Sequence, residues 1–246
     1  MLRAAQRPTE FVMTVVELSH VSKHYLLGVE RVAAVSDITL RICARSFTVL
    51  SGPSGSGKST LLNLIGCIDR PDDGYLRIGG ETVQNWTDTE LTAFRASHIG
   101  FIFQNFNLLP VLSAWENVEY PLLLAGTPAA DRRRRVDEML DAVGLSDKAR
   151  HRPNQLSGGQ CQRVAIARAL IHQPDLILAD EPTANLDSQT AMGIITLMRD
   201  LQRERDTSFV FSSHDPMLIS QADELVQLRD GRIVPPDSNQ ASGAPR

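Results

Sequence analysis

Residues 52–60 read Gly-Pro-Ser-Gly-Ser-Gly-Lys-Ser-Thr, a segment whose three glycines are followed by a lysine and two hydroxyl side chains. Glycines let the backbone curl so that successive N–H groups converge on one point, and the helix that follows aims its positive end there. The lysine then places its charge on the β- and γ-phosphates of a nucleotide, and the first hydroxyl ligates Mg²⁺. The expected nucleotide-binding residues are therefore Gly52, Pro53, Ser54, Gly55, Ser56, Gly57, Lys58, Ser59 and Thr60, with Ser59 also a metal ligand.

A second set of chemical groups follows an apolar run, Leu176–Ala179, which has no polar side chain and predicts a strand buried on both faces. The run delivers Asp180 and Glu181 to the carboxyl end of a sheet, where ligands bind in open α/β folds. Neighbouring residues of a strand point to opposite sides, so the two carboxylates are expected to have separate roles. Asp180 is expected to hold Mg²⁺, and Glu181 to orient and polarise an attacking water as a general base.

A third segment, Ser157, Gly158, Gly159 and Gln160, precedes an apolar-periodic helix. Serine is a favoured N-cap, and two glycines leave the first N–H groups of the helix open, which makes a second anion site. Simple helix capping would explain the same residues. Nothing in the segment itself indicates which phosphate it would meet.

With Leu156 the third segment reads LSGGQ, and the three motifs in this order make the chain resemble the ABC (ATP-binding cassette) ATPases from about Val15 to Val234. The resemblance implies that the chain binds ATP with Mg²⁺ and hydrolyses ATP to ADP and phosphate. It also implies a head-to-tail homodimer in which LSGGQ of one subunit contacts the γ-phosphate held by the phosphate loop of the other. A single chain would then be inactive. No Asn-Lys-x-Asp guanine motif is present, which argues against a GTPase.

The resemblance gives roles to four further residues. Gln104, in the Q-loop between the core and a helical part, would reach Mg²⁺ or the attacking water, and His214 would contact the γ-phosphate during catalysis. Asp187, in the D-loop, would bind at the junction of the two subunits. Tyr25 stands where an aromatic ring stacks on adenine, although it could equally be a surface aromatic.

Two patterns of secondary structure surround these motifs. Strands are expected at Val15–Leu18, Ala34–Ile42 and Phe47–Ser51, and after the turn that ends at Gly74. The alternation of polar and apolar residues over 37–42 is typical of a half-buried antiparallel strand. After Gln160, helices alternate with apolar strands, which indicates a parallel α/β core; these elements are expected at Gln160–Ile171, Leu176–Ala179, Ser188–Glu204, Ser208–Ser212 and Pro216–Gln221.

The middle of the chain is helical by period, at Trp115–Leu124 and Ala129–Val143. A run of four arginines, Arg132–Arg135, could be a basic patch for an acidic partner. We favour a solvated helix face, because acidic residues at 131, 137, 138 and 141 balance the charge.

The expected fold is α/β, a P-loop NTPase with a parallel core sheet, an N-terminal antiparallel β subdomain and an inserted α-helical subdomain at about residues 105–160. The ATPase domain is expected at 13–234, between an N-terminal tail (1–12) and a Pro-, Ser- and Gly-rich tail (235–246) that is expected to be disordered.

Bulk properties exclude several other classes. A 42% hydrophobic content in 246 residues allows a real core, and a net charge of -4 shows no bias toward nucleic acid. Three cysteines without a CxxC pair predict reduced thiols in a cytosolic protein. The sequence contains no run of 18 apolar residues, so no membrane span is expected. The first residues lack the apolar stretch of a signal peptide.

The segments Asn105–Pro110, Glu116–Leu124 and Glu181–Asp187 resemble one branch of the family, the lipoprotein-release, macrolide-export and cell-division ATPases. That branch implies a peripheral subunit on the cytoplasmic face of the inner membrane. It would dock on a separate membrane permease and power export or mechanical work. The alternative is a soluble ABC ATPase acting on ribosomes or DNA. Such proteins carry two cassettes or a long coiled coil, and this chain shows neither.

Overall fold

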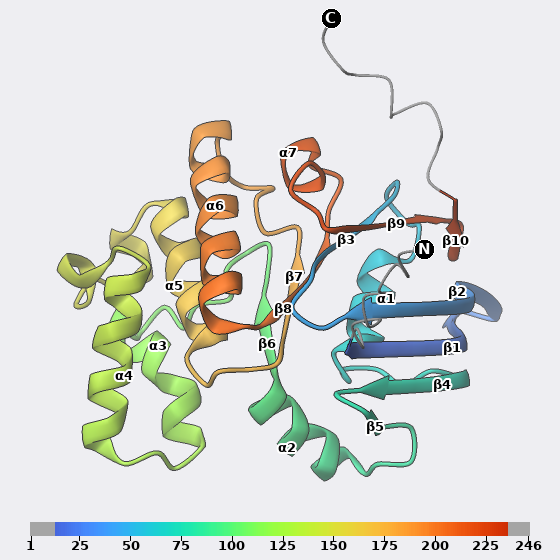
Figure 1. Ribbon diagram of the computed structural model, residues 1–246, viewed down its shortest axis with the longest axis horizontal. Coiled ribbons are helices and arrows are strands. Elements are labelled where there is room, and N and C mark those ends of the chain that lie inside the picture. Colours follow the sequence, from blue (N-terminus) through green and yellow to red (C-terminus); the bar gives the residue numbers. More distant parts are fainter. Residues whose placement is uncertain (1–12, 236–246) are drawn as a thin grey trace, which may run out of the picture.

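The computed structural model describes residues 13–235. The expectations for an N-terminal tail and for disorder after Val234 fall on residues outside this range, apart from Pro235. Figure 1 shows the helical part of the molecule at the left, an antiparallel sheet at the right, and the strands of a second sheet between them.

The antiparallel sheet has the strand order β2-β1-β4-β5, which confirms the expected N-terminal β subdomain. Its strands are β1 (Thr14–Leu27), β2 (Glu30–Cys43), β4 (Asp73–Ile78) and β5 (Glu81–Thr82). On β2 the side chains of Ile38 and Ile42 are buried whereas those of Thr39 and Arg41 are exposed. The period of two in the sequence therefore does place one face of this sheet against the core.

The core sheet has the order β10-β9-β3-β8-β7-β6. Its strands are β3 (Phe47–Ser51), β6 (Ile99–Ile102), β7 (Leu176–Asp180), β8 (Ser208–Ser212), β9 (Glu224–Arg229) and β10 (Arg232–Val234). All neighbours pair in parallel except β10, which is antiparallel to β9. Leu50 and Asp180 both pair with Ser212, so the carboxyl ends of β3, β7 and β8 meet at one edge. The chain segments that follow these three strands are thereby brought together.

The helices are α1 (Lys58–Ile65), α2 (Asp88–His98), α3 (Ala114–Leu124), α4 (Ala129–Ala142), α5 (Gly158–Leu170), α6 (Ser188–Arg205) and α7 (Pro216–Ile219), with short 3-10 helices η1 (Ser146–Lys148) and η2 (Pro153–Gln155).

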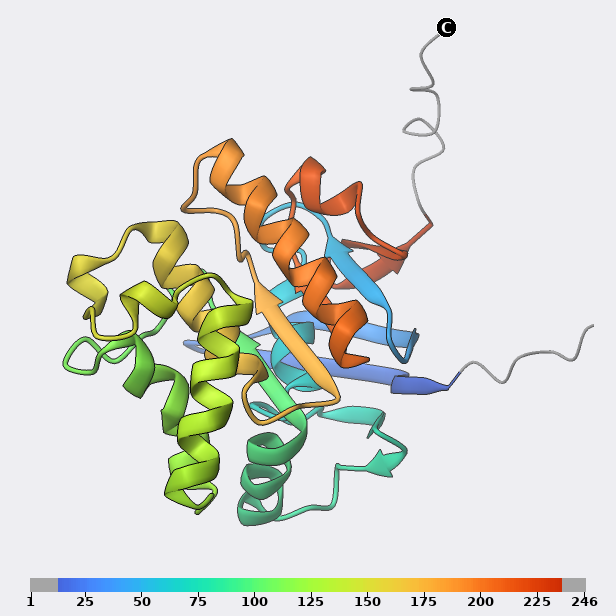
Figure 2. The same ribbon diagram turned by 60° about the vertical axis from the view of Figure 1, so that its left-hand side comes forward.

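Side chains alternate across the core sheet and divide the hydrophobic core into two layers. On one face, Phe47, Phe209 and Phe211 pack with the helices α3 to α6. On the other face, Leu50, Val210 and their neighbours pack with α1, α2 and the antiparallel sheet. Figures 1 and 2 show this arrangement, with α6 and α5 lying on the side of the core strands away from α1.

Several elements lie outside the sequence expectations. The helix α2 was not expected because Leu91 and Phe94 are its buried residues and the remaining positions are polar or small. Its start nevertheless carries a detectable signal, since Thr87 and Glu90 form a reciprocal capping box. The strand β6 has four residues, and β9 buries two, Val226 and Leu228, so neither gives a strong periodic pattern.

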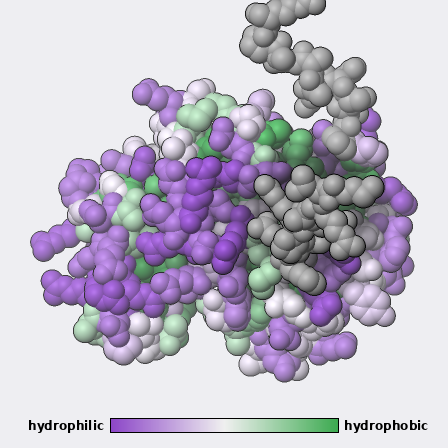
Figure 3. Space-filling view, in the orientation of Figure 1, coloured by the Kyte–Doolittle hydropathy of each residue, from purple (hydrophilic) through white to green (hydrophobic). Residues whose placement is uncertain are grey.

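The run of four arginines on α4 divides between two roles. Arg133 and Arg134 are exposed and pair with Asp137 and Glu138 one turn further on, as expected for a solvated face. Arg132 is largely buried against Glu119, and Arg135 donates to the carbonyl oxygen of Ile171. The face that α4 and α6 present in Figure 3 is largely hydrophilic. Two of the four arginines therefore pack within the protein.

Two further expectations concern the cysteines and the membrane. Cys43, Cys67 and Cys161 are all free thiols, as expected. No helix within residues 13–235 combines the length and the apolar character needed to cross a bilayer.

Candidate functional site

The loop between β3 and α1 curls as the glycine pattern predicts. Gly57, which precedes α1, has φ of 99°, and a Cβ there would lie 2.5 Å from the carbonyl oxygen of Ala34. This position therefore requires glycine both for its backbone conformation and for the close approach of β2. No side chain caps α1, so its first N–H groups stay open to a ligand.

A cavity of about 580 Å³ opens above this loop. It is lined by the whole phosphate loop together with groups from other segments: Ala34, Gly52, Pro53, Ser54, Gly55, Ser56, Gly57, Lys58, Ser59, Thr60, Gln104, Glu181, Ala184, Ser212 and His214. The Lys58 ammonium donates to the carbonyl oxygens of Gly52 and Pro53, at 2.8 and 2.9 Å. These two bonds hold a positive charge at the point where the loop's N–H groups converge, which suits a phosphate chain.

Two oxygen ligands for a cation lie at the same edge of the sheet. The Ser59 hydroxyl at the start of α1 is 3.3 Å from a carboxylate oxygen of Asp180 at the end of β7. Magnesium prefers oxygen ligands and keeps several waters, so this pair and a phosphate oxygen fit the ion. Among residues 13–235, no cluster of three or more His, Cys, Asp or Glu side chains could hold a metal on its own. The donor set therefore fits a cation that arrives with a nucleotide.

The expectation that Asp180 and Glu181 are neighbours on one strand is wrong. The strand β7 ends at Asp180, and Glu181 has φ of 44°, in the left-handed region. Its N–H group donates to the Ser212 carbonyl oxygen at 2.9 Å, which turns the chain across the end of β8. This turn, not the alternation of a strand, separates the two carboxylates and directs Glu181 into the cavity.

The Glu181 carboxylate is held by two side chains that follow β8. The Ser213 hydroxyl donates to one oxygen at 3.2 Å, and Nδ1 of His214 lies 2.9 Å from the other. The Glu181 side chain is 19% exposed and that of His214 is 75% exposed. A carboxylate only accepts hydrogen bonds, so in this arrangement Nδ1 carries the proton and Nε2 faces away from Glu181. Glu181 and His214 were predicted from their sequence motifs, whereas Ser213 was not, because only the fold brings it to the carboxylate.

The segment between Glu181 and α6 is tied to two other parts of the site. The Asn185 amide donates to the Gln104 carbonyl oxygen at 3.1 Å and to the Asn105 side chain at 3.2 Å. Asp187 accepts bonds from the N–H groups of Gln189 and Thr190 and so caps α6. In this chain Asp187 thus has a capping role, and its place at a subunit junction stays a prediction.

The Ser157 segment forms the predicted N-cap of α5. Its hydroxyl accepts from the N–H of Gln160 at 3.3 Å, and the Gln160 side chain accepts from the N–H of Ser157 at 2.9 Å. In the described part of the chain, the cavity lining includes none of residues 156–160. The two predicted phosphate-binding ends, at α1 and α5, therefore do not share one cavity within a single chain.

Tyr25 lies on β1 with 38% of its surface exposed. Its hydroxyl donates to Asp69, which follows α1, at 2.8 Å. Burial and this hydrogen bond raise the pKa of Tyr25, and a weaker opposing effect comes from a hydrogen bond with Thr60, a residue of the cavity wall. The ring is thus fixed beside the phosphate loop, although it is not part of the cavity lining.

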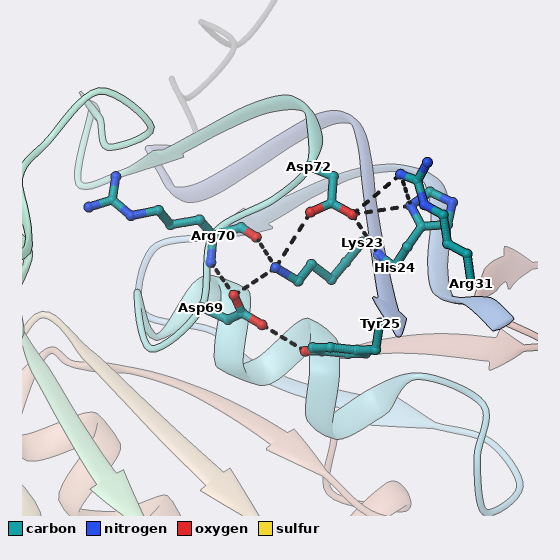
Figure 4. Close-up of polar contacts among 7 residues, drawn as sticks. All are labelled: Lys23, His24, Tyr25, Arg31, Asp69, Arg70 and Asp72. Atoms are coloured by element: carbon teal, nitrogen blue, oxygen red, sulfur yellow. Dashed lines mark hydrogen bonds and ion pairs between the residues drawn. The ribbon is translucent and has the colours of Figure 1, made fainter. Parts of the chain in front are cut away.

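A network of polar contacts supports Asp69 (Figure 4). The Lys23 ammonium donates to Asp69 and to the Arg70 carbonyl oxygen, each at 2.8 Å, and lies 3.5 Å from Asp72. Burial would raise the pKa of Asp69, but hydrogen bonds from Lys23, Tyr25 and the Arg70 N–H, together with the charge of Lys23, outweigh burial and lower the pKa. The carboxylate is therefore ionised at neutral pH. Asp69 was not predicted from the sequence, because nothing in its own segment links it to position 25.

Comparison with known proteins gives consistent relatives. The ABC transporter family model matches residues 35–184. An uncharacterized ABC transporter ATP-binding protein of Thermotoga maritima is 49% identical over 219 residues, which cover 89% of this chain and 93% of that protein. The macrolide export ATP-binding/permease protein MacB 1 of Yersinia pestis is 44% identical over 89% of this chain, which spans 33% of that protein's length.

A solved structure gives a similar result. It is described as the dimeric structure of a post-hydrolysis state of the ATP-binding cassette MJ0796 bound to ADP and Pi. It is 43% identical to this chain, with a TM-score of 0.82, and the match covers 89% of this chain and 97% of that one.

Proposed function

The chain belongs to the ABC transporter family, and we propose that its phosphate-loop cavity binds ATP with Mg²⁺ and hydrolyses it to drive a separate membrane permease. The chain is the ATP-binding subunit of an ABC transporter of export type, and it is an ATPase. One observation carries the proposal. The loop, the Ser59–Asp180 pair and the Glu181–His214 pair lie at one edge of one sheet, at a single cavity.

Each group has a role that follows from its place in or beside the cavity. Lys58 and the N–H groups at the start of α1 bind the β- and γ-phosphates. Ser59, Asp180 and the Gln104 amide would hold Mg²⁺, which would neutralise phosphate charge when bound. Tyr25 offers a ring beside the loop on which adenine would stack. These residues bind and orient the nucleotide.

Glu181 and His214 act on the reacting end of the nucleotide. The Glu181 carboxylate faces the cavity and would accept a hydrogen bond from the attacking water, which it orients and polarises. His214 holds that carboxylate through Nδ1 and would place its other nitrogen toward the γ-phosphate. The Ser213 hydroxyl fixes the second carboxylate oxygen.

The second helix end, at Ser157, supports a head-to-tail dimer. Its capping box engages the N–H groups of Ser157 and Gln160, and those of Gly158 and Gly159 between them suit a phosphate. This helix end nevertheless lies outside the cavity of its own chain. A second copy would bring Ser157, Gly158, Gly159 and Gln160 to the phosphates held by the first, with Asp187 at the junction between copies. The description of the similar cassette as dimeric, with bound ADP and Pi, supports this arrangement.

The proposed partner is an integral membrane permease, and the proposed location is the cytoplasmic face of the inner membrane. The macrolide export relative is named as an ATP-binding/permease protein, and this chain matches 33% of its length. That name supports a membrane permease as the part that this ATP-binding domain drives. Co-purification of the chain with an integral membrane protein would support this function. Salt-sensitive binding to ribosomes or DNA would favour the alternative of an ATPase without a permease.

The substitution Glu181→Gln tests the proposed reaction. It keeps the shape of the side chain but removes the carboxylate that orients water, so turnover is expected to fall by about 10²–10⁴-fold. ATP binding is expected to persist, and the protein should accumulate as an ATP-bound dimer in size-exclusion chromatography. The exposed Glu204 on α6 gives a matched control, because Glu204→Gln changes the same atoms away from the cavity. Unchanged hydrolysis in the Glu181→Gln protein would contradict the proposal.

A further inference from the structure

Gln162 is a buried polar side chain on α5 that takes no part in the reaction described above. It is fully buried, at 0% exposure. Its amide nitrogen donates to the carbonyl oxygen of Pro182 at 2.7 Å. Its amide oxygen is buried and has no hydrogen-bond partner among residues 13–235. A half-paired amide in a hydrophobic core lowers stability, so an apolar side chain would serve the packing of α5 better.

The bond from Gln162 ends next to the reactive carboxylate. Pro182 directly follows Glu181, whose backbone has φ of 44°. Such a conformation is unfavourable for a residue with a Cβ and persists only where the surroundings hold it. On one side, the Glu181 N–H is fixed by the Ser212 carbonyl oxygen at 2.9 Å. On the other side, the Glu181 carbonyl oxygen accepts from the N–H of Ala184 at 3.2 Å, and the next carbonyl oxygen, that of Pro182, accepts from Gln162. Proline has no N–H, so Gln162 holds this residue through its carbonyl oxygen.

We propose that Gln162 is a positioning residue for hydrolysis, whose amide fixes the strained backbone at Glu181 and so aims the carboxylate into the cavity. The inference rests on the proposed role of Glu181. The bond also links α5, the helix capped by Ser157, to Pro182, the residue that follows Glu181 in the same chain.

The substitution Gln162→Met tests the proposal. Methionine has similar length and suits an apolar core, but it removes the donor to Pro182. Loss of this bond should let Glu181 shift, so kcat is expected to fall about 10-fold, since a misplaced group costs up to two orders of magnitude. The dissociation constant for ATP is expected to stay within about twofold, because the phosphate loop is untouched. Gln162→Asn, which keeps an amide but is too short for the bond, is a second variant with the same expected loss of kcat.

Gln202 on α6 provides a matched control. It is also a buried glutamine, 5% exposed, and its amide donates to a backbone carbonyl oxygen, that of Arg45, at 2.6 Å. Gln202→Met therefore removes the same kind of bond at a distance from the cavity. The thermal stability of the Gln202→Met protein should fall, while its kcat should stay within about twofold of wild type. Equal losses of kcat in the two methionine variants would overturn the proposal, and so would wild-type kcat in Gln162→Met.

A double variant separates this inference from the proposed function. In the Glu181→Gln background, Gln162→Met should cause no further loss in single-turnover rate, because the carboxylate that it positions is already absent. A further 10-fold loss there would show that Gln162 acts elsewhere and would overturn the inference. If Glu181→Gln alone keeps wild-type turnover, the proposed function fails. If Glu181→Gln is inactive but Gln162→Met is fully active, only the role of Gln162 fails.

Discussion

The first turns of α1 and α5 both combine glycine with a hydroxyl side chain, yet their surroundings differ. At α1, the helix has no side-chain cap, and Lys58, Asp180 and Glu181 gather at its end. At α5, Ser157 and Gln160 cap each other. The side chains and backbone that a Cβ at Gly158 or Gly159 would meet belong to Leu186, Phe106, Asn185 and Thr190, none of which is ionisable.

The difference shows what each helix end can do. The end of α1 brings together an ammonium, oxygen groups suited to a cation and the Glu181 carboxylate, so we expect it to hold a nucleotide and act on it. The end of α5 supplies N–H donors and a hydroxyl, so it can stabilise a phosphate that another group holds. We therefore expect one chain to carry the groups that bind and hydrolyse ATP at the start of α1, and a separate phosphate-recognition site at the start of α5.

The largest expected effects come from disabling each end in turn. Lys58→Ala should weaken ATP binding about 10-fold or more and reduce turnover with it, because a charge-assisted contact to phosphate is lost. Ser157→Arg should leave ATP binding to the single chain unchanged but reduce dimer turnover by about 10²-fold, the usual cost of losing a donor to the transition state. Nucleotide titration of dilute protein and steady-state hydrolysis measure the two quantities. Loss of binding in the Ser157→Arg chain would break the comparison.

A mixed dimer sharpens the same test. It combines one subunit carrying Ser157→Arg with one carrying Lys58→Ala. If the two ends meet across subunits, one site keeps both intact parts and hydrolyses ATP above the level of either variant homodimer. If both ends act within one chain, each site is defective and the mixed dimer is as inactive as the homodimers.

A moderate effect is expected at the second glycine of α5. A Cβ at Gly159 would lie 2.5 Å from the methyl group of Thr190, whose hydroxyl is fixed by Asp187 at 2.6 Å. Gly159→Ala should therefore push against α6 and lower stability by about 1–3 kcal/mol, seen as a fall in Tm. Gly158→Ala, with its nearest contact at 3.5 Å, should leave Tm unchanged or slightly higher.

Rescue identifies the cause of that effect. Adding Thr190→Ser to Gly159→Ala removes the opposing methyl group and keeps the hydroxyl that contacts Asp187, so Tm should recover. A Tm that stays low in the double variant would mean that Gly159 is needed for some reason other than the packing of α5 on α6.

The smallest expected effect concerns Tyr25, and it tests whether the ring beside the phosphate loop recognises the adenine base. Tyr25→Phe keeps the ring but removes the hydroxyl bond to Asp69, which should cost about 1 kcal/mol, or about fivefold in KM for ATP. The value of kcat should not change, since the ring does not touch the reacting atoms. Tyr75→Phe on the exposed part of β4 is the control, because Tyr75 is 69% exposed. An unchanged KM in Tyr25→Phe would show that the Asp69 network does not support nucleotide binding.

Much of the site was predictable because its residues lie in continuous motifs. The phosphate loop, β3 and β7 follow from glycine spacing and apolar runs that depend on neighbours in the sequence. The roles of Ser213, Asn185 and Asp69 were not predictable, because each contacts a residue at least 32 positions away. The strands β6 and β9 were also missed, since few buried residues leave a weak pattern in a short strand.

The sequence by itself determined the phosphate loop, the two acidic residues and the capped start of α5, because local backbone freedom and side-chain type dictate these features. Only the tertiary structure decided that Glu181 leaves its strand in a left-handed turn, and that Ser212, Ser213 and His214 meet it there. Only the tertiary structure separated α1 from α5, by placing them on opposite faces of the core sheet. The reason is physical: parallel pairing of β3, β7 and β8 sets which strand ends meet, and residues far apart in the chain contribute to that pairing.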